Sequence, residues 1–140
     1  MTYGIKNVEN TFAPDHRILI FWNHGGLAKV CVDDIFGRDS LDMHEMWQAL
    51  EKVYPNASSE NPPFEIIGFD ACLRATYDNA NNISKFANYM VASAALESGY
   101  GGYYTGWINE LSRNPAMNGK DLGEIICRNS YEDCDKHSLA

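Results

Sequence analysis

An α/β domain with a mostly parallel sheet is the fold class that this sequence predicts. Residues 17–22 and 64–69 are two apolar runs rich in β-forming side chains, and each reads as a short buried strand. Apolar residues recur at helical spacing between them, as a parallel β-α-β connection requires. Residues 88–93 form a third apolar run. The chain has 140 residues, 45% of them hydrophobic, which suits a single domain over residues 1–140 with a substantial core.

The segments before and between the first two strands are assigned from spacing and turn residues. Residues 1–16 are polar and predict a helix tail or a loop. Residues 27–39 predict an exposed charged loop with a short hairpin near 30–32. Asp39 or Ser40 is expected to cap the next helix, which ends before a proline. The apolar face of that helix consists of Met43, Met46, Trp47, Leu50 and Val53.

The C-terminal half predicts two further helical regions around the third strand. A helix is expected over residues 73–87, although its asparagines weaken it. Residues 97–104 are rich in Gly and Tyr, a composition typical of a loop that approaches a ligand closely. Residues 107–114 and 122–126 predict a short helix and a last amphipathic helix. The polar tail at 130–140 is expected to fray.

The composition limits the partners of the chain. Its net charge of −8 argues against a nucleic-acid surface, because such a surface needs a basic patch. No apolar run has the length of a membrane span, and residues 1–12 lack the features of a signal peptide. The cysteines form no Cys-x-x-Cys pair and the histidines show no zinc-like spacing, so no metal site is predicted. The four cysteines are Cys31, Cys72, Cys127 and Cys134.

Two reactive side chains follow the first two predicted strands. His24 comes after the first run and Cys72 after the second. If these runs are neighbouring parallel strands, their tips lie about 5 Å apart, which places His24 beside Cys72. A helix expected just after Cys72 would favour the thiolate through its N-terminal amides and dipole. The pair is then a nucleophile with a proton donor and acceptor. The alternative is that Cys72 is a small buried hydrophobe.

Three short motifs carry a resemblance to a known family. They are Trp-Asn-His-Gly-Gly at 22–26, Gly-Phe-Asp-Ala-Cys-Leu at 68–73, and Tyr-Met-Val-Ala-Ser at 89–93 with Glu-Ser-Gly-Tyr-Gly at 97–101. With these motifs, residues 17–132 resemble the clostripain family of cysteine peptidases, relatives of gingipains, legumains and caspases. The resemblance implies a caspase-like three-layer α/β/α sandwich. Family domains begin earlier and continue further, so the chain is expected to be an incomplete part of the catalytic domain.

The resemblance implies a cysteine endopeptidase that cleaves after Arg or Lys through a Cys/His dyad. Cys72 would attack the scissile carbonyl, and His24 would protonate the leaving amine. The backbone N–H groups of Gly25 and Cys72 would hold the oxyanion. Asp70 matches the family's acid that selects Arg or Lys, since a carboxylate binds a guanidinium by charge-assisted, often bidentate bonds. The alternative is that Asp70 caps the following helix.

Two positions depart from the family pattern. Leu27 stands where the family has a third glycine. Tyr100 stands near the place where some relatives carry a second acid, and Glu97 is expected to compensate in part. Ser93, Glu97 and Tyr100 therefore join Asp70 as candidate substrate-binding residues.

Some relatives mature by cutting themselves in the loop after the histidine. In this chain that loop holds Lys29 and Arg38, and either basic side chain fits an Asp70 pocket. Arg38 is the better candidate because Gly37 loosens the backbone before it. The alternative is a charged loop that is never cut. Some relatives also use calcium, so the resemblance leaves calcium open, but the acids of this loop lack EF-hand spacing and the residues predict no cofactor.

Peptide or protein substrates are the partners that the resemblance implies, with no nucleic acid and no membrane. It also suggests a secreted or cell-envelope location, and the oligomeric state stays unknown. A non-catalytic α/β module, an interaction or peptide-binding remnant, is the second hypothesis, because missing strands leave sheet edges exposed. A flavodoxin-like ligand-binding domain is a weaker third hypothesis, since no phosphate-cradling glycine loop is present.

Overall fold

Three parallel strands form the centre of the chain. The computed structural model describes residues 1–12, 14–27, 29–35, 37–97, 99 and 101–138. Within these residues the strand order of the main sheet is β1-β4-β5, and both pairs are parallel. This confirms the predicted α/β class with a mostly parallel sheet. The three strands are β1 (Ile18–Trp22), β4 (Phe64–Asp70) and β5 (Ala87–Ala92).

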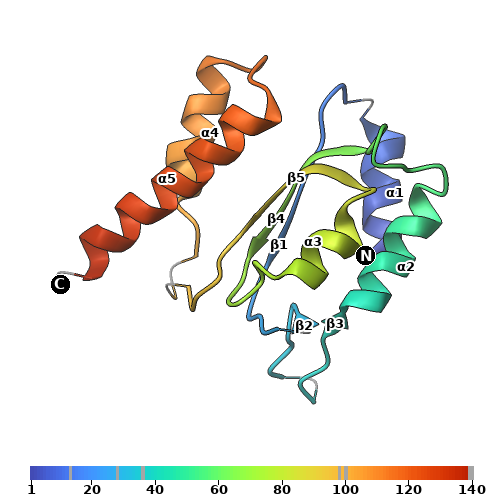
Figure 1. Ribbon diagram of the computed structural model, residues 1–140, viewed down its shortest axis with the longest axis horizontal. Coiled ribbons are helices and arrows are strands. Elements are labelled where there is room, and N and C mark those ends of the chain that lie inside the picture. Colours follow the sequence, from blue (N-terminus) through green and yellow to red (C-terminus); the bar gives the residue numbers. More distant parts are fainter. Residues whose placement is uncertain (13, 28, 36, 98, 100, 139–140) are drawn as a thin grey trace.

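Helices cover both faces of this sheet, which gives three layers (Figure 1). Residues on alternating sides of the strands enter two separate cores, as strand geometry requires. Ile67 and Phe69 face the first core, whereas Ile66 faces the second. The first layer is α1 (Thr2–Thr11), α2 (Met43–Val53) and α3 (Tyr77–Ile83), and the opposite layer is α4 (Tyr104–Arg113) and α5 (Gly119–Ser138).

Helix α2 confirms the predicted spacing but not the predicted cap. Met46 and Leu50 are fully buried in the first core, as expected from their spacing. The N-cap is Asp42, because its side chain accepts a hydrogen bond from the Glu45 amide at 2.8 Å. The Glu45 carboxylate in turn accepts from the Asp42 amide at 3.0 Å, which completes a capping box. The expectation of a cap at Asp39 or Ser40 was therefore wrong.

The strands β2 (Lys29–Val30) and β3 (Leu41–Asp42) form a small antiparallel pair. The hairpin expected near 30–32 is observed as antiparallel pairing at Val30, whose partners are Leu41 in β3 and, through an isolated bridge, Gly25. This pairing closes the predicted charged loop at its base. The loop thus leaves the tip of β1 and returns directly to the start of α2.

Two helix boundaries also differ from the prediction. Helix α3 begins at Tyr77, capped by Thr76, and not at residue 73. The amides of Leu73 and Ala75 donate instead to the carbonyls of Ala95 and Ser93, so they are not available to a helix. Helix α5 begins at Gly119 and continues to Ser138, beyond both ends of the helix expected at 122–126.

We predict that Asp42→Ala lowers the free energy of unfolding by about 1 kcal/mol, because it removes a side-chain acceptor from the first turn of α2. Urea unfolding is the measurement. The matched control is Ser40→Ala, which is expected to stay within about 0.5 kcal/mol of the parent. Equal losses in the two variants would show that the capping box contributes nothing to stability.

Candidate active site

His24 and Cys72 leave adjacent strand tips in matching positions. The parallel register of β1 and β4 pairs Trp22 with Asp70, and each reactive residue lies two positions further along its own strand. Both residues line one cavity of about 320 Å³ at the carboxyl edge of the sheet. In open α/β sheets this edge is where functional crevices form. The two side chains therefore border the same cavity.

The turn at Cys72 differs from the predicted strand-to-helix junction. Since α3 begins only at Tyr77, Cys72 does not stand at the N-terminus of the helix that follows it, and that part of the prediction was wrong. Instead, Leu73 adopts a left-handed backbone with φ of 58°. The amide of Glu97 donates a hydrogen bond to the Cys72 sulfur at 3.3 Å. The loop after β5 thus supplies the backbone donor that the sequence assigned to a helix.

His24 lines the cavity with an exposed imidazole. Its side chain is 73% exposed, and its Nε2 lies 3.3 Å from Oδ2 of Asp34. Asp34 also faces Arg38, with 3.7 Å between Oδ1 and Nε. Sequence reasoning weighed Asp34 only as one of the loop acids considered for calcium and did not predict its contact with His24, although an acid in the loop just after the histidine is a signal that was available. Asp34 contacts His24 through Nε2 and not through the other ring nitrogen, Nδ1.

Gly25 brings the histidine turn against the cysteine turn. A Cβ at Gly25 would lie 2.8 Å from Cβ of Ala71 and 2.9 Å from the carbonyl oxygen of Cys72. Both separations are shorter than real Cβ contacts, so only glycine permits this approach. The two backbone segments that were predicted to supply oxyanion donors, Gly25 and Cys72, are therefore in direct contact.

Asp70 is held by the loop that precedes α4. Both of its carboxylate oxygens accept from the Gly102 amide, at 3.0 and 2.9 Å, and Oδ2 also accepts from the Tyr104 hydroxyl at 2.9 Å. Burial and the Asp70 carboxylate together raise the pKa of Tyr104, so this phenol remains a donor. The alternative that Asp70 caps the next helix is excluded, because Thr76 caps α3.

Glu97 forms a carboxyl pair with Asp70. Burial, and then the charge of Asp70, raise the pKa of Glu97 to about 7. A side-chain hydrogen bond with Asp70 acts in the same direction, since two carboxyl groups can share one proton. Oε2 of Glu97 is buried and has no hydrogen-bond partner among the described residues. Glu97 therefore offers an acceptor, whereas the Asp70 oxygens are already hydrogen-bonded.

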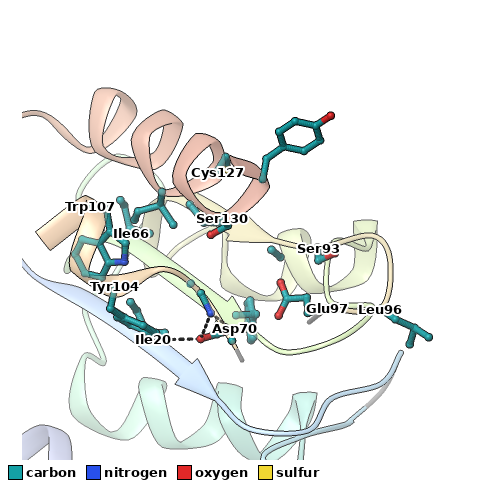
Figure 2. Close-up of a pocket in the computed structure, with 18 residues that line it drawn as sticks. Ile20, Ile66, Asp70, Ser93, Leu96, Glu97, Tyr104, Trp107, Cys127 and Ser130 are labelled. Carbon is teal, nitrogen blue, oxygen red and sulfur yellow. Dashed lines mark hydrogen bonds between the residues drawn. The ribbon is translucent and has the colours of Figure 1, made fainter. Parts of the chain in front are cut away.

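A second cavity of about 300 Å³ lies on the face of the sheet that α4 and α5 cover (Figure 2). Asp70, Glu97 and Gly101 line both cavities, so the carboxyl pair stands where they meet. The walls beyond the pair are mainly apolar and include Trp107 and Ile126. Figure 2 shows Glu97 and Asp70 on one side of this space, with Trp107 and Ile66 at its far end.

The remaining predicted site residues are placed as follows. Ser93 lines the second cavity, but its hydroxyl takes part in a local turn with the Ala95 backbone. Tyr100 lies outside the described residues. Lys29 begins β2, and Arg38 is 79% exposed with a left-handed φ of 61°. Of the substrate-binding candidates, the structure thus brings Asp70 and Glu97 together.

No group of three or more His, Cys, Asp or Glu side chains among the described residues is arranged to hold a metal ion. Within the same residues, no helix combines the length and apolar character needed to cross a membrane.

The fold and this crevice define the class of the protein. It is an α/β protein with a cysteine and a histidine at the carboxyl edge of neighbouring parallel strands. A family model described as the clostripain family, Peptidase C11, matches residues 1–140. The chain belongs to this family.

Two solved structures share the fold. One is a secreted C11 cysteine protease from Bacteroides thetaiotaomicron in complex with an irreversible peptide inhibitor, with a TM-score of 0.74 and 20% identity over 96% of this chain. The other is an inactive zymogen C11 protease from Parabacteroides distasonis, with a TM-score of 0.66 and 21% identity over 94% of this chain. The matches cover 36% and 34% of those chains, so this chain spans about a third of their length. No curated protein matches the sequence.

We predict that Gly25→Ala lowers the free energy of unfolding by about 1–3 kcal/mol, because its Cβ forces the histidine and cysteine turns apart. Gly26→Ala is the matched control, since a Cβ at Gly26 meets no atom within 4 Å. Denaturant unfolding of both variants is the measurement. A Gly25 variant as stable as the Gly26 variant would contradict the close approach.

Proposed function

We propose that this protein is a cysteine endopeptidase in which Cys72 is the nucleophile and His24 is the general acid and base. The observation that carries the proposal is the register of β1 and β4, which sets both residues two positions beyond the Trp22–Asp70 pair and into one cavity. Membership of the clostripain family supports the same chemistry. Because the chain spans about a third of the similar structures, the activity is proposed for the full-length protein.

The proposed reaction proceeds through a thioester. His24 takes the proton of the Cys72 thiol, and the sulfur attacks the carbonyl carbon of the scissile bond. His24 then gives the proton to the departing amine as the carbon–nitrogen bond breaks, and water hydrolyses the thioester. We assign the negative oxygen to the amides of Gly25 and Cys72, and each such donor contributes on the order of 3 kcal/mol in related chemistry. These steps use protein groups alone, so we propose no cofactor.

We propose that the substrate is a peptide or protein with Arg or Lys before the scissile bond. The carboxyl pair of Asp70 and Glu97 lies at the meeting of the two cavities, within reach of a side chain bound beside Cys72. Asp70 already accepts bonds from Gly102 and Tyr104, which leaves the unpartnered Oε2 of Glu97 as the acceptor for a cation. A buried acceptor without a donor favours a ligand that supplies one.

We also propose a secreted location and self-processing. The Bacteroides neighbour is described as secreted, and the Parabacteroides neighbour is a zymogen. Arg38 is exposed in the loop between β2 and β3, which suits a cutting position, and Lys29 is the second candidate. Exposed loops are the segments that enter protease sites most readily.

We predict that Cys72→Ala abolishes peptide cleavage by the full-length protein without unfolding it. The matched control is Cys127→Ala, which removes an exposed cysteine of α5 and is expected to leave cleavage within about threefold of the parent. Peptide hydrolysis and a far-ultraviolet circular dichroism spectrum are the measurements.

Iodoacetamide labelling of the parent and of His24→Ala separates a peptidase from a non-catalytic binding module. In a peptidase, iodoacetamide labels Cys72 faster than Cys127, and His24→Ala removes that advantage. Cleavage that survives Cys72→Ala would exclude the assigned nucleophile. Cysteines that all label at one rate, together with no cleavage by the parent, would favour the binding module.

We predict that the preference for Arg over Leu before the scissile bond increases by about tenfold as the pH rises through about 7, where Glu97 loses its proton. Below that pH the pair carries one negative charge, and above it carries two, so a cationic side chain binds better. The measurement is the ratio of kcat/KM for two peptides that differ only at this residue. The ratio cancels pH effects on the catalytic groups that both peptides share.

The matched variants for this prediction are Glu97→Gln and Glu60→Gln. Glu97→Gln is expected to lower the ratio and to remove its pH dependence, whereas Glu60 is exposed and its variant keeps both. Asp70→Asn is less informative alone, because Asp70 also holds Gly102 and Tyr104. An Arg-to-Leu ratio of kcat/KM that does not change in Glu97→Gln would show that Glu97 does not contribute to recognition of the substrate side chain.

A further inference from the structure

Arg74 is a fully buried cation that lies two residues after the proposed nucleophile. Its exposed fraction is 0%, and no carboxylate pairs with it among the described residues. Burial lowers the pKa of the guanidinium. A buried charge is costly unless its donors find acceptors, so its hydrogen bonds show what it holds in place. Sequence reasoning gave Arg74 no role.

The acceptors of one guanidinium nitrogen belong to the turn that follows His24. Nη1 of Arg74 donates to the carbonyl oxygen of Gly26 at 2.8 Å. It also lies within hydrogen-bond distance of the carbonyls of Lys29, at 3.3 Å, and Leu27, at 3.4 Å. The side chain therefore gathers three carbonyls of the segment that begins two residues after the proposed general base.

The other guanidinium nitrogen, Nη2, is hydrogen-bonded to a residue that follows Cys72 in the chain. Nη2 donates to Oδ1 of Asn79 at 3.0 Å, and the Asn79 amide nitrogen donates back to the Arg74 carbonyl. The guanidinium carbon lies 5.0 Å from the ring centroid of Phe69 on β4. Asn79 is also fully buried. Arg74 is thus anchored to β4 and α3, and it reaches across to the histidine turn.

The Arg74 side chain links the histidine turn to the cysteine turn beyond the end of the hydrogen-bonded ladder of β1 and β4. The ladder of β1 and β4 ends at the Trp22–Asp70 pair, followed by one bond of 3.4 Å from the Asn23 amide to the Asp70 carbonyl. Beyond that point, the backbone of Gly25 closely approaches the backbone of Cys72. The Arg74 hydrogen bonds are the polar ties between the two turns that the structure describes past this point.

We propose that Arg74 is a positioning residue, which sets the place of His24 relative to Cys72 by holding the carbonyls of residues 26, 27 and 29 against the cysteine turn. The proposal rests on the proposed peptidase function, because it assigns Arg74 an effect on that dyad. Arg74 touches no substrate and moves no proton. Its effect on the reaction comes from the distance and orientation of the two reacting side chains.

The test uses the full-length protein with Arg74→Met and Arg74→Lys. We expect Arg74→Met to lower kcat by about 100-fold, the size of effect that a displacement of about 1 Å causes, with KM nearly unchanged. Arg74→Lys keeps the charge but not the planar fork, so about a tenfold loss is expected, a partial rescue. The rate of iodoacetamide labelling of Cys72, with Cys127 as internal reference, is expected to fall in the same order across pH.

Two control variants separate positioning from lost stability. Arg113→Met makes the same substitution at an exposed arginine of α4 and is expected to leave kcat unchanged. Phe86→Leu truncates a fully buried ring of the first core, so it lowers the melting temperature while kcat is retained. A folded Arg74→Met with kcat within threefold of the parent would overturn the proposal. A kcat loss no larger than that of an equally destabilised Phe86→Leu would do the same.

The remaining outcomes are also decisive. If Arg74→Met does not fold, Arg74→Lys decides, and an unchanged kcat and labelling profile in that variant overturns the proposal. If the parent does not cleave peptides, the peptidase proposal fails and the labelling ratio of Cys72 to Cys127 tests Arg74 separately. A ratio that Arg74→Met leaves unchanged then overturns the positioning role, and a reduced ratio supports it.

Discussion

The parallel pairing of β1 with β4 is the constraint on which the site depends. It aligns Trp22 with Asp70, and the chain leaves both strands toward the same edge. His24 and Cys72 each lie two residues beyond this pair, so the backbone ladder brings them to the same cavity. Gly25 then permits the close approach of the two turns, and Arg74 holds them by hydrogen bonds.

The two carboxyl groups beside this site have different surroundings and hence different roles. Asp70 accepts from Gly102 and Tyr104, so its charge orders the loop before α4. Glu97 is buried against that charge, and its pKa is raised to about 7. Because one acid is satisfied and the other is not, the pair can hold the loop and still offer an acceptor to a ligand. A single carboxylate does not meet both demands as readily.

The parts of the fold that followed from the sequence are those set by local composition and spacing. The strands β1, β4 and β5 were predicted because each is a short run of apolar, β-forming residues, and the buried stripe of α2 because its side chains repeat at helical spacing. The start of α3 was missed because distant carbonyls decide it, since Ala95 and Ser93 accept from the amides of Leu73 and Ala75. The cap of α2 was placed too early because Asp39, Ser40 and Asp42 are all suitable caps, and the pairing of β2 with β3 selects Asp42.

The sequence by itself determined the family, the α/β class and the identity of His24, Cys72 and Asp70 as candidates, because each depends on residue types in a fixed order along the chain. Only the tertiary structure decided what surrounds them. Glu97 contacts the sulfur and the Asp70 carboxyl, and Arg74 joins two turns, through contacts between residues 25 to 48 positions apart. Such contacts leave no periodic trace in the sequence, since they arise only when the sheet brings separate loops to one edge.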